Sequence, residues 1–232
     1  MMTKILSVCI ILFLFTASLS FTVISFSPAL SKTQNNYDNI ILITGFKPFD
    51  VYDINPSEQI ALQLNNTIFQ NYTIKGYVLP VNYTTAPAKM KQLITDFDPA
   101  LILSLGLAGN AKEIQIETFG VNLKIDPEVK YPLLTLSKVN QTGSWIQRAT
   151  YDIPKIISQI KKENISVEQS YSAGFYLCNA ILYETLFYQI ETDQLIPAGF
   201  IHVPQLNTQH PEGMSVDDMI HAVHAAIIAQ IS

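Results

Sequence analysis

Short apolar segments that alternate with amphipathic segments are the feature that most constrains the fold of this chain. Residues 40–44 and 101–105 are almost continuously apolar, as expected of strands buried on both faces. Between them, Met90, Leu93 and Ile94 fall on one face of a helix. A sheet covered on both sides by helices is mainly parallel. The sequence therefore predicts a single-domain α/β/α sandwich with a mainly parallel sheet.

Helix-start signals support this alternation. Asn55 and Pro56 supply an N-cap and a proline at the first helical position, and Ser215 with Asp218 repeats the capping pattern near the end of the chain. The remaining elements follow from apolar periodicity. We expect further strands at 77–81, 114–118 and 199–203, and further helices at 153–161 and from about residue 175.

Composition excludes several classes of protein. Hydrophobic residues make up 48% of the 232 residues and charged residues 14%, which excludes intrinsic disorder as the main description. The formal net charge is −5, without a basic cluster that could neutralise phosphates, so we expect no nucleic-acid partner. Two cysteines cannot form a disulfide framework.

The amino-terminal region is typical of a targeting segment. Residues 1–31 contain one charged residue, Lys4, followed by an apolar run, with small residues before a cleavage position at Lys32. The apolar character extends over residues 5–26, long enough for an uncleaved membrane anchor. We therefore predict a signal peptide or anchor at 1–31, a folded domain at 32–232, and an extracytoplasmic location.

Glycine-containing loops mark where a site is expected. In open α/β sheets, ligands bind beyond the carboxyl ends of strands. Residues 45–49, 106–109, 172–178 and 202–204 qualify by position. None of them contains a phosphate-loop or dinucleotide-binding fingerprint, so we predict no nucleotide or other cofactor.

Cys178 is the strongest candidate for a reactive group. A lone cysteine in an apolar helix is usually a small core residue. However, Ser172-Ala173-Gly174 precedes the predicted helix, and the amides at a helix N-terminus favour a thiolate in its first turn. An exported chain also lacks a reducing environment that would protect a spare thiol. These arguments favour a chemical role, provided that a base lies nearby.

Four histidines could supply that base. His202 ends an apolar strand at the edge where sites form, although a buried structural histidine is the alternative. His221 and His224 lie three residues apart on the last predicted helix, but three metal ligands are not assembled there, so we predict no metal site. His210 lies in a polar loop and carries little signal.

A third group must orient the imidazole in cysteine peptidase chemistry. Glu113, Gln115 and Glu117 alternate with apolar residues and so share one face of a predicted strand. Glu117 is the candidate for the orienting carboxylate, with Glu113 as the second choice.

Four blocks of sequence resemble the pyroglutamyl peptidase type I family, the pyrrolidone-carboxylate peptidases, which are cysteine peptidases. Residues 44–49 with Asn55-Pro56-Ser57 resemble the family's Thr-Gly-Phe-x-Pro-Phe and Asn-Pro-Ser opening. Residues 117–122, 172–179 and 200–204 resemble its glutamate, nucleophile and histidine segments. The blocks occur in the right order and span nearly all of the chain after residue 31.

The resemblance implies an enzyme that removes an amino-terminal pyroglutamyl residue from peptides through a thioester. It implies Cys178 as the nucleophile, His202 as general base and then acid, and Glu117 as the orienting carboxylate. It further implies that Phe46 and Phe49 enclose the flat lactam. A small aromatic slot suits a group that carries neither charge nor free amine. We expect Leu107 and Leu177 to line the same substrate site.

The sequence departs from the family pattern at the pocket. Leu107 and Ala111 replace a glutamine and an arginine, and Asp50-Val51 replaces a Gly-Gly pair. These changes motivate two alternatives, a non-catalytic protein that binds peptides or blocked amino termini, and a cysteine amidase for another small acyl group. Homo-oligomer formation and membrane attachment through residues 5–26 stay open at this point.

Overall fold

The computed structural model describes residues 39–125 and 135–232. The predicted signal peptide or anchor at 1–31, including the apolar stretch 5–26, lies outside the described residues. No helix within the described ranges is long and apolar enough to cross a bilayer.

Strands and helices alternate along most of the described chain. The strands are β1 (Ile40–Phe46), β2 (Ile68–Phe69), β3 (Tyr72–Leu79), β4 (Leu101–Leu107), β5 (Ile114–Glu117), β6 (Phe119–Val121), β7 (Ile146–Arg148), β8 (Val167–Ser170) and β9 (Ala198–Val203). The helices are α1 (Pro56–Leu64), α2 (Thr85–Phe97), α3 (Ile153–Lys162), α4 (Leu177–Glu191) and α5 (Val216–Ile231).

The main sheet has seven strands in the order β2-β3-β1-β4-β9-β5-β8. Its centre is parallel, because β1 pairs in parallel with β3 and β4, and β4 with β9. The pair β5 and β8 runs antiparallel to β9, and β2 is antiparallel to β3. The predicted α/β class with a mainly parallel sheet is therefore confirmed, and the reversed direction of β5 and β8 is a feature that the sequence did not reveal.

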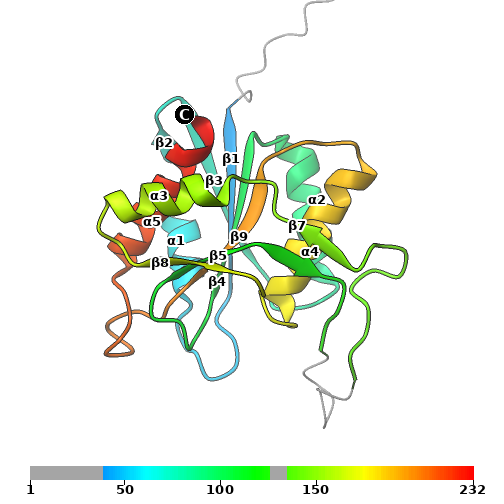
Figure 1. The fold of residues 1–232 in the computed structure, drawn as a ribbon, viewed down its shortest axis with the longest axis horizontal. Helices are drawn as coiled ribbons and strands as arrows, with labels where there is room; N and C mark the ends of the chain where they lie inside the picture. Colours follow the sequence, from blue (N-terminus) through cyan, green and yellow to red (C-terminus); the bar gives the residue numbers. More distant parts are fainter. Residues whose placement is uncertain (1–38, 126–134) are drawn as a thin grey trace, which may run out of the picture. The chain divides into compact units, whose positions relative to one another are not determined.

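Two hydrophobic cores lie on the two faces of the sheet. Figure 1 shows α1, α3 and α5 on one side of the central strands, and α2 and α4 on the other. Side chains alternate between these cores along each strand, as the period of a strand requires. Ile41 and Ile43 of β1 pack toward α1, α3 and α5, whereas Leu42 and Phe46 pack toward α2 and α4.

The predicted helix starts are confirmed. The Asn55 side chain accepts a hydrogen bond from the Ser57 amide, and Pro56 occupies the first turn of α1. Ser57 also accepts a hydrogen bond from the Phe46 amide, which fixes α1 against the end of β1. At α5, Ser215 accepts from the Asp218 amide. These caps satisfy amides that would otherwise lack partners at the helix ends.

Some elements differ from the prediction. The strand expected at 77–81 spans Tyr72–Leu79 instead, since Pro80 cannot donate to a ladder. Helix α4 begins two residues later than expected. The short strands β2, β6, β7 and β8 were not predicted. Their two to four residues are too few to show a clear period, and β8 is mostly polar because it forms an edge of the sheet.

Candidate active site

His202 lies one residue before the end of β9, between two neighbouring strands. It pairs with Gly106 of β4 on one side and with Gln115 of β5 on the other. Its side chain leaves the sheet on the same face as that of Phe200, which packs in the core beneath α2 and α4. His202 is only 7% exposed, so its imidazole interacts mainly with protein groups.

Cys178 is brought to this face by helix α4. It is the second residue of the helix and is partly buried. A Cβ atom placed on Gly106 would lie 3.0 Å from the Cys178 sulfur. The sulfur therefore lies over Gly106, next to His202 in the neighbouring strand, close enough for the cysteine to raise the pKa of the histidine.

Gly106 provides the space that the sulfur occupies. A Cβ at this position would also come within 2.7 Å of the Phe200 ring, a distance at which atoms must move apart. The site thus depends on a position without a side chain. Gly106 begins one of the glycine-containing segments that mark the expected site, and the structure places it in β4, but a single sequence gives no indication that this glycine lies under the cysteine.

The residue after the cysteine fixes the start of α4. Asn179 is fully buried, and its side chain accepts a hydrogen bond from the Val121 amide at 2.8 Å. It also donates to the carbonyl oxygens of Val121 and Leu123. These three bonds hold the first turn of the helix against the chain around β6, so the cysteine has little freedom to move away from the sheet.

Glu117 reaches His202 because β5 runs antiparallel to β9. Gln115 stands directly opposite His202, and Glu117, two residues later, is its diagonal neighbour on the same face. The Oε1 atom of Glu117 lies 2.7 Å from Nδ1 of His202. The carboxylate is fully buried. Contact with Nδ1 leaves Nε2 as the ring nitrogen that can meet the sulfur. Glu113, the second choice from sequence, precedes β5 and is partly exposed.

Opposing effects set the charge of this histidine. Burial alone lowers the pKa of His202, whereas the negative charge and hydrogen bond of Cys178 and those of Glu117 raise it, to about 9 in total. At neutral pH the imidazole is therefore protonated, with the Cys178 side chain on one side and the Glu117 carboxylate on the other. A cysteine beside a buried imidazolium, with a carboxylate behind the ring, is the arrangement that cysteine peptidase chemistry requires.

The raised pKa predicts how stability depends on pH. His202 titrates near ~6.5 in an unfolded chain and at about 9 in the folded protein, so the folded state alone holds the proton between these values. This contribution to the free energy of unfolding is complete below the lower value and is lost as the pH rises through the upper one. We expect a loss of roughly 3 kcal/mol across this window.

Urea unfolding at pH values below, within and above that window measures the effect. His202→Gln is the matched variant, because it keeps the other three histidines. The variant should lose most of the pH dependence in this window. An equal slope in the two proteins would show that another group carries it.

The other predicted site residues lie in different surroundings. Phe46 is buried at the end of β1, with its ring 6.3 Å from that of Phe200, and Leu177 packs in the same core as Phe46. Phe49 is partly buried and contacts Tyr52, with 5.5 Å between the ring centroids. Leu107 follows Gly106 in β4 and is buried, and the alternation of side chains places it on the face opposite Cys178.

Of the residues that depart from the family pattern, Leu107 ends β4, whereas Asp50, Val51 and Ala111 lie on the loops after β1 and β4. Asp50 has a φ of 52°, a left-handed conformation that glycine adopts most easily and aspartate tolerates. Val51 beside it is 77% exposed. The Ala111 amide donates to the Ala108 carbonyl oxygen in the turn that follows β4. Of these loop positions, Asp50 is the one whose backbone adopts the conformation that glycine favours.

No group of three metal-binding side chains is present among the described residues. His224 stacks on the Phe69 ring with 4.4 Å between the ring centroids, and burial and the nearby His221 lower its pKa. The His210 ring accepts a hydrogen bond from the Glu212 amide. These three histidines therefore have surroundings unrelated to Cys178.

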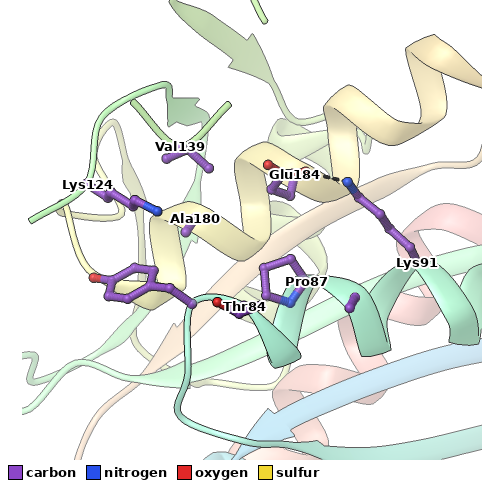
Figure 2. Close-up of a pocket in the computed structure, with 9 residues that line it drawn as sticks. Thr84, Pro87, Lys91, Lys124, Val139, Ala180 and Glu184 are labelled. Carbon is purple, nitrogen blue, oxygen red and sulfur yellow. Dashed lines mark ion pairs between the residues drawn. The ribbon is translucent and has the colours of Figure 1, made fainter. Parts of the chain in front are cut away.

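A separate hollow of about 230 Å³ lies between α2 and α4. Figure 2 shows Lys91 and Glu184 joined across it, with 2.7 Å between the Lys91 Nζ and a Glu184 carboxylate oxygen. Lys124 and Tyr83 also line the hollow, with the Lys124 amine 5.2 Å from the centroid of the Tyr83 ring. Cys178, His202 and Glu117 do not line this hollow.

Comparisons with known proteins identify the family to which this chain is similar. A family profile described as pyroglutamyl peptidase matches residues 39–232. The pyrrolidone-carboxylate peptidase of Halalkalibacterium halodurans is 32% identical over 192 residues, which are 80% of this chain and 96% of that protein. The corresponding protein of Thermoanaerobacter sp. is 34% identical over 196 residues, covering 81% and 95%.

Solved structures give the same result. The pyrrolidone carboxyl peptidase from Thermococcus litoralis superposes with a TM-score of 0.77 at 29% identity, covering 83% of this chain and 93% of that one. A variant of the enzyme from Pyrococcus furiosus also has a TM-score of 0.77, at 28% identity, with 83% and 98% covered. The likeness therefore includes sequence, fold and nearly the full length of the relatives.

Proposed function

Since this chain belongs to the pyroglutamyl peptidase family, a family of cysteine peptidases, we propose that it removes an amino-terminal pyroglutamyl residue from peptides through a thioester on Cys178. The observation that carries the proposal is the placement of the Cys178 sulfur over Gly106, beside a buried His202 whose Nδ1 lies 2.7 Å from Glu117.

Acylation uses the thiolate and the imidazolium in turn. The sulfur attacks the carbonyl carbon that joins the pyroglutamyl group to the next residue, and a carbon–sulfur bond forms. His202 then gives its proton to the amide nitrogen as the carbon–nitrogen bond breaks. The shortened peptide leaves as a neutral amine. Its departure leaves a pyroglutamyl thioester on Cys178 and a neutral imidazole.

Deacylation returns the enzyme to its starting state. His202 takes a proton from a water molecule as the water oxygen attacks the thioester carbonyl carbon, and the carbon–sulfur bond breaks. Pyroglutamic acid and the thiolate–imidazolium pair result, and the acid then loses its proton to solvent. Helix α4 begins at Leu177, and the amides of its first turn are suited to stabilise the negative oxygen that develops in both steps.

An apolar environment next to the sulfur suits the acyl group. Phe46 lies two residues beyond Thr44 in β1, and Thr44 pairs with Ser104, two residues before Gly106 in β4. Phe46 is therefore beside Gly106 on the face that carries the cysteine. We propose Phe46 and Leu177 as lining residues, with Phe49 on the loop after β1 as a further one. Leu107 ends β4 with its side chain on the opposite face, so we propose that it lines the acyl-group site through its backbone.

We also propose, from the sequence alone, that residues 1–31 direct the domain out of the cytoplasm, either as a removed signal or as an anchor through residues 5–26. The intact mass of the exported protein tests this, because a removed leader lowers the mass by that segment. An unprocessed protein retained in the cytoplasm would contradict the proposal.

Turnover of a set of blocked fluorogenic amides tests the proposed function. We expect kcat/KM for the pyroglutamyl amide to exceed that for the prolyl, N-acetylalanyl and cyclopentanecarbonyl amides at least about tenfold. The prolyl group lacks the ring carbonyl, the N-acetylalanyl group lacks the ring, and the cyclopentanecarbonyl group lacks both the N–H and the ring carbonyl. Preference for another acyl group would identify a different cysteine amidase. Binding of pyroglutamyl peptides without turnover would identify a non-catalytic relative.

A further inference from the structure

Tyr151 contacts both strands that carry the carboxylate and the histidine of the site. Its hydroxyl accepts a hydrogen bond from the Phe200 amide at 3.1 Å and lies 2.7 Å from the Phe200 carbonyl oxygen. The same hydroxyl lies 3.0 Å from the carbonyl oxygen of Glu117. Phe200 is two residues before His202, so one side chain links the backbones of both functional segments.

We propose that Tyr151 is a positioning residue, which holds β5 and β9 so that the Glu117 carboxylate stays within hydrogen-bond distance of His202. This inference rests on the proposed function, since it assigns Tyr151 to the same catalytic arrangement. Tyr151 was not a candidate in the sequence. It precedes the helix predicted at 153–161 and matches none of the four blocks.

The register of the two strands explains why a side chain is needed there. Gln115 pairs with His202 and Ile116 with Ile201, so the next antiparallel pair would join Glu117 and Phe200. At that step the Tyr151 hydroxyl binds the backbone groups of both residues. The hydroxyl thus replaces the last pair of the ladder and sets the separation of the strands directly under the Glu117 side chain.

The backbone around Tyr151 is itself held between the two strands. The Ala149 amide donates to the Thr118 carbonyl oxygen, and the Thr150 amide donates to the Ala198 carbonyl oxygen, each at 2.9 Å. The Thr150 hydroxyl accepts from the Ala198 amide at 2.8 Å. The segment is therefore anchored on both sides before its hydroxyl enters the ladder.

The ring of Tyr151 approaches from the face opposite the catalytic groups. It packs in the core formed with α1, α3 and α5. It fills the space above Gly199, where an added Cβ would lie 1.8 Å from a ring carbon. The ring thus leaves the substrate side free. Burial and the nearby Glu117 charge both raise the pKa of Tyr151, so the hydroxyl keeps its proton and can serve both as donor and as acceptor.

Tyr151→Phe tests the proposal, since it removes the hydroxyl and keeps the ring. The Phe200 amide then lacks its acceptor, and the end of β5 is free to shift away from the histidine. We expect kcat for the pyroglutamyl amide to fall about tenfold or more, because a small misplacement of a catalytic pair is costly, whereas KM should stay within about twofold.

A titration of His202 gives a readout that does not depend on turnover. The titratable groups that face the ring are Glu117 from β5 and Cys178 from α4, while β4 contributes only Gly106. NMR signals of the His202 ring, assigned by their loss in His202→Gln, should titrate near 9 in the natural protein. In Tyr151→Phe the midpoint should fall toward 6.5, because the carboxylate no longer aligns with Nδ1.

Tyr183→Phe is the matched control. The Tyr183 side chain is also buried, and its hydroxyl donates to the Ser144 carbonyl oxygen at 2.6 Å, outside the catalytic groups. This variant should keep the wild-type kcat and His202 midpoint. Thr150→Val removes the hydroxyl that anchors the same segment to Ala198, so it should change kcat and the His202 midpoint in the same direction as Tyr151→Phe does. Thr150→Val is also the substitute test if Tyr151→Phe does not fold.

Two results would overturn the proposal. The first is that Tyr151→Phe has the same kcat and the same His202 midpoint as the natural protein. If Tyr151→Phe does not fold, the same result in Thr150→Val would overturn the proposal. The other is an equal change in Tyr183→Phe, which would indicate a general loss of stability. Failure of the proposed function looks different. The natural protein would then not cleave the pyroglutamyl amide, while the His202 midpoints would still decide whether Tyr151 positions the pair.

Discussion

Cys178→Ala should abolish cleavage of pyroglutamyl amides, with a loss of at least about 10⁴-fold in kcat. The sulfur is the atom that forms the covalent intermediate, and the alanine methyl group cannot attack a carbonyl. Because Cys178 is only partly buried and lies over Gly106, its truncation removes few packing contacts. We therefore expect the fold to persist. Initial rates will quantify the loss, measured at an enzyme concentration high enough for the residual turnover to be detected.

Cys178→Ser provides the control for packing. It restores an atom over Gly106 but supplies a hydroxyl, which is a much weaker nucleophile than a thiolate at neutral pH. Both variants should remain folded, and their free energy of unfolding in urea should fall by no more than the roughly 3 kcal/mol that protonation of His202 contributes. Full activity in Cys178→Ala would refute the assignment of the nucleophile. If Cys178→Ala lost activity because it did not fold, the activity of the folded Cys178→Ser variant would test the assignment instead.

Glu117→Gln should lower kcat about 10⁴-fold, the order of magnitude found when the orienting carboxylate of a catalytic triad is replaced by its amide. The change keeps the shape of the side chain and removes its charge next to Nδ1 of His202, 2.7 Å away. Burial would then lower the pKa of His202 against less opposition, so less of the ring carries a proton at neutral pH. Steady-state kinetics with the pyroglutamyl amide measure this loss.

Glu113→Gln is the matched control for that variant. Glu113 belongs to the same alternating pattern but is partly exposed before the start of β5. It should retain activity within about twofold, as expected of a surface position. If Glu113→Gln lost as much activity as Glu117→Gln, the orienting role of Glu117 would be wrong.

Much of the fold was predictable from local signals in the sequence. The strands around residues 40 and 101 are continuously apolar because both faces of the sheet are covered, and such strands have a clear pattern. Asn55 and Ser215 mark helix starts because their side chains satisfy exposed amides. Cys178, His202 and Glu117, chosen from sequence together with the family resemblance, lie together in the structure.

The remaining features depend on contacts between distant segments. The direction of β5 relative to β9 follows from how the chain returns to the sheet, and a short strand does not encode its direction. Tyr151 acts through its hydroxyl on residues 34 and 49 positions away in the sequence. Gly106 is needed because of a sulfur that comes from another element. No periodicity or motif in a single sequence reports such contacts.

Trapping of the acyl-enzyme tests the central claim most directly. A pyroglutamyl aryl ester acylates quickly, so the thioester should accumulate and survive an acid quench. Peptide mass mapping should then find one pyroglutamyl group on the peptide that contains Cys178, and none in Cys178→Ala. Turnover that continues while Cys178 stays unmodified, or a pyroglutamyl group attached to another residue, would contradict the account.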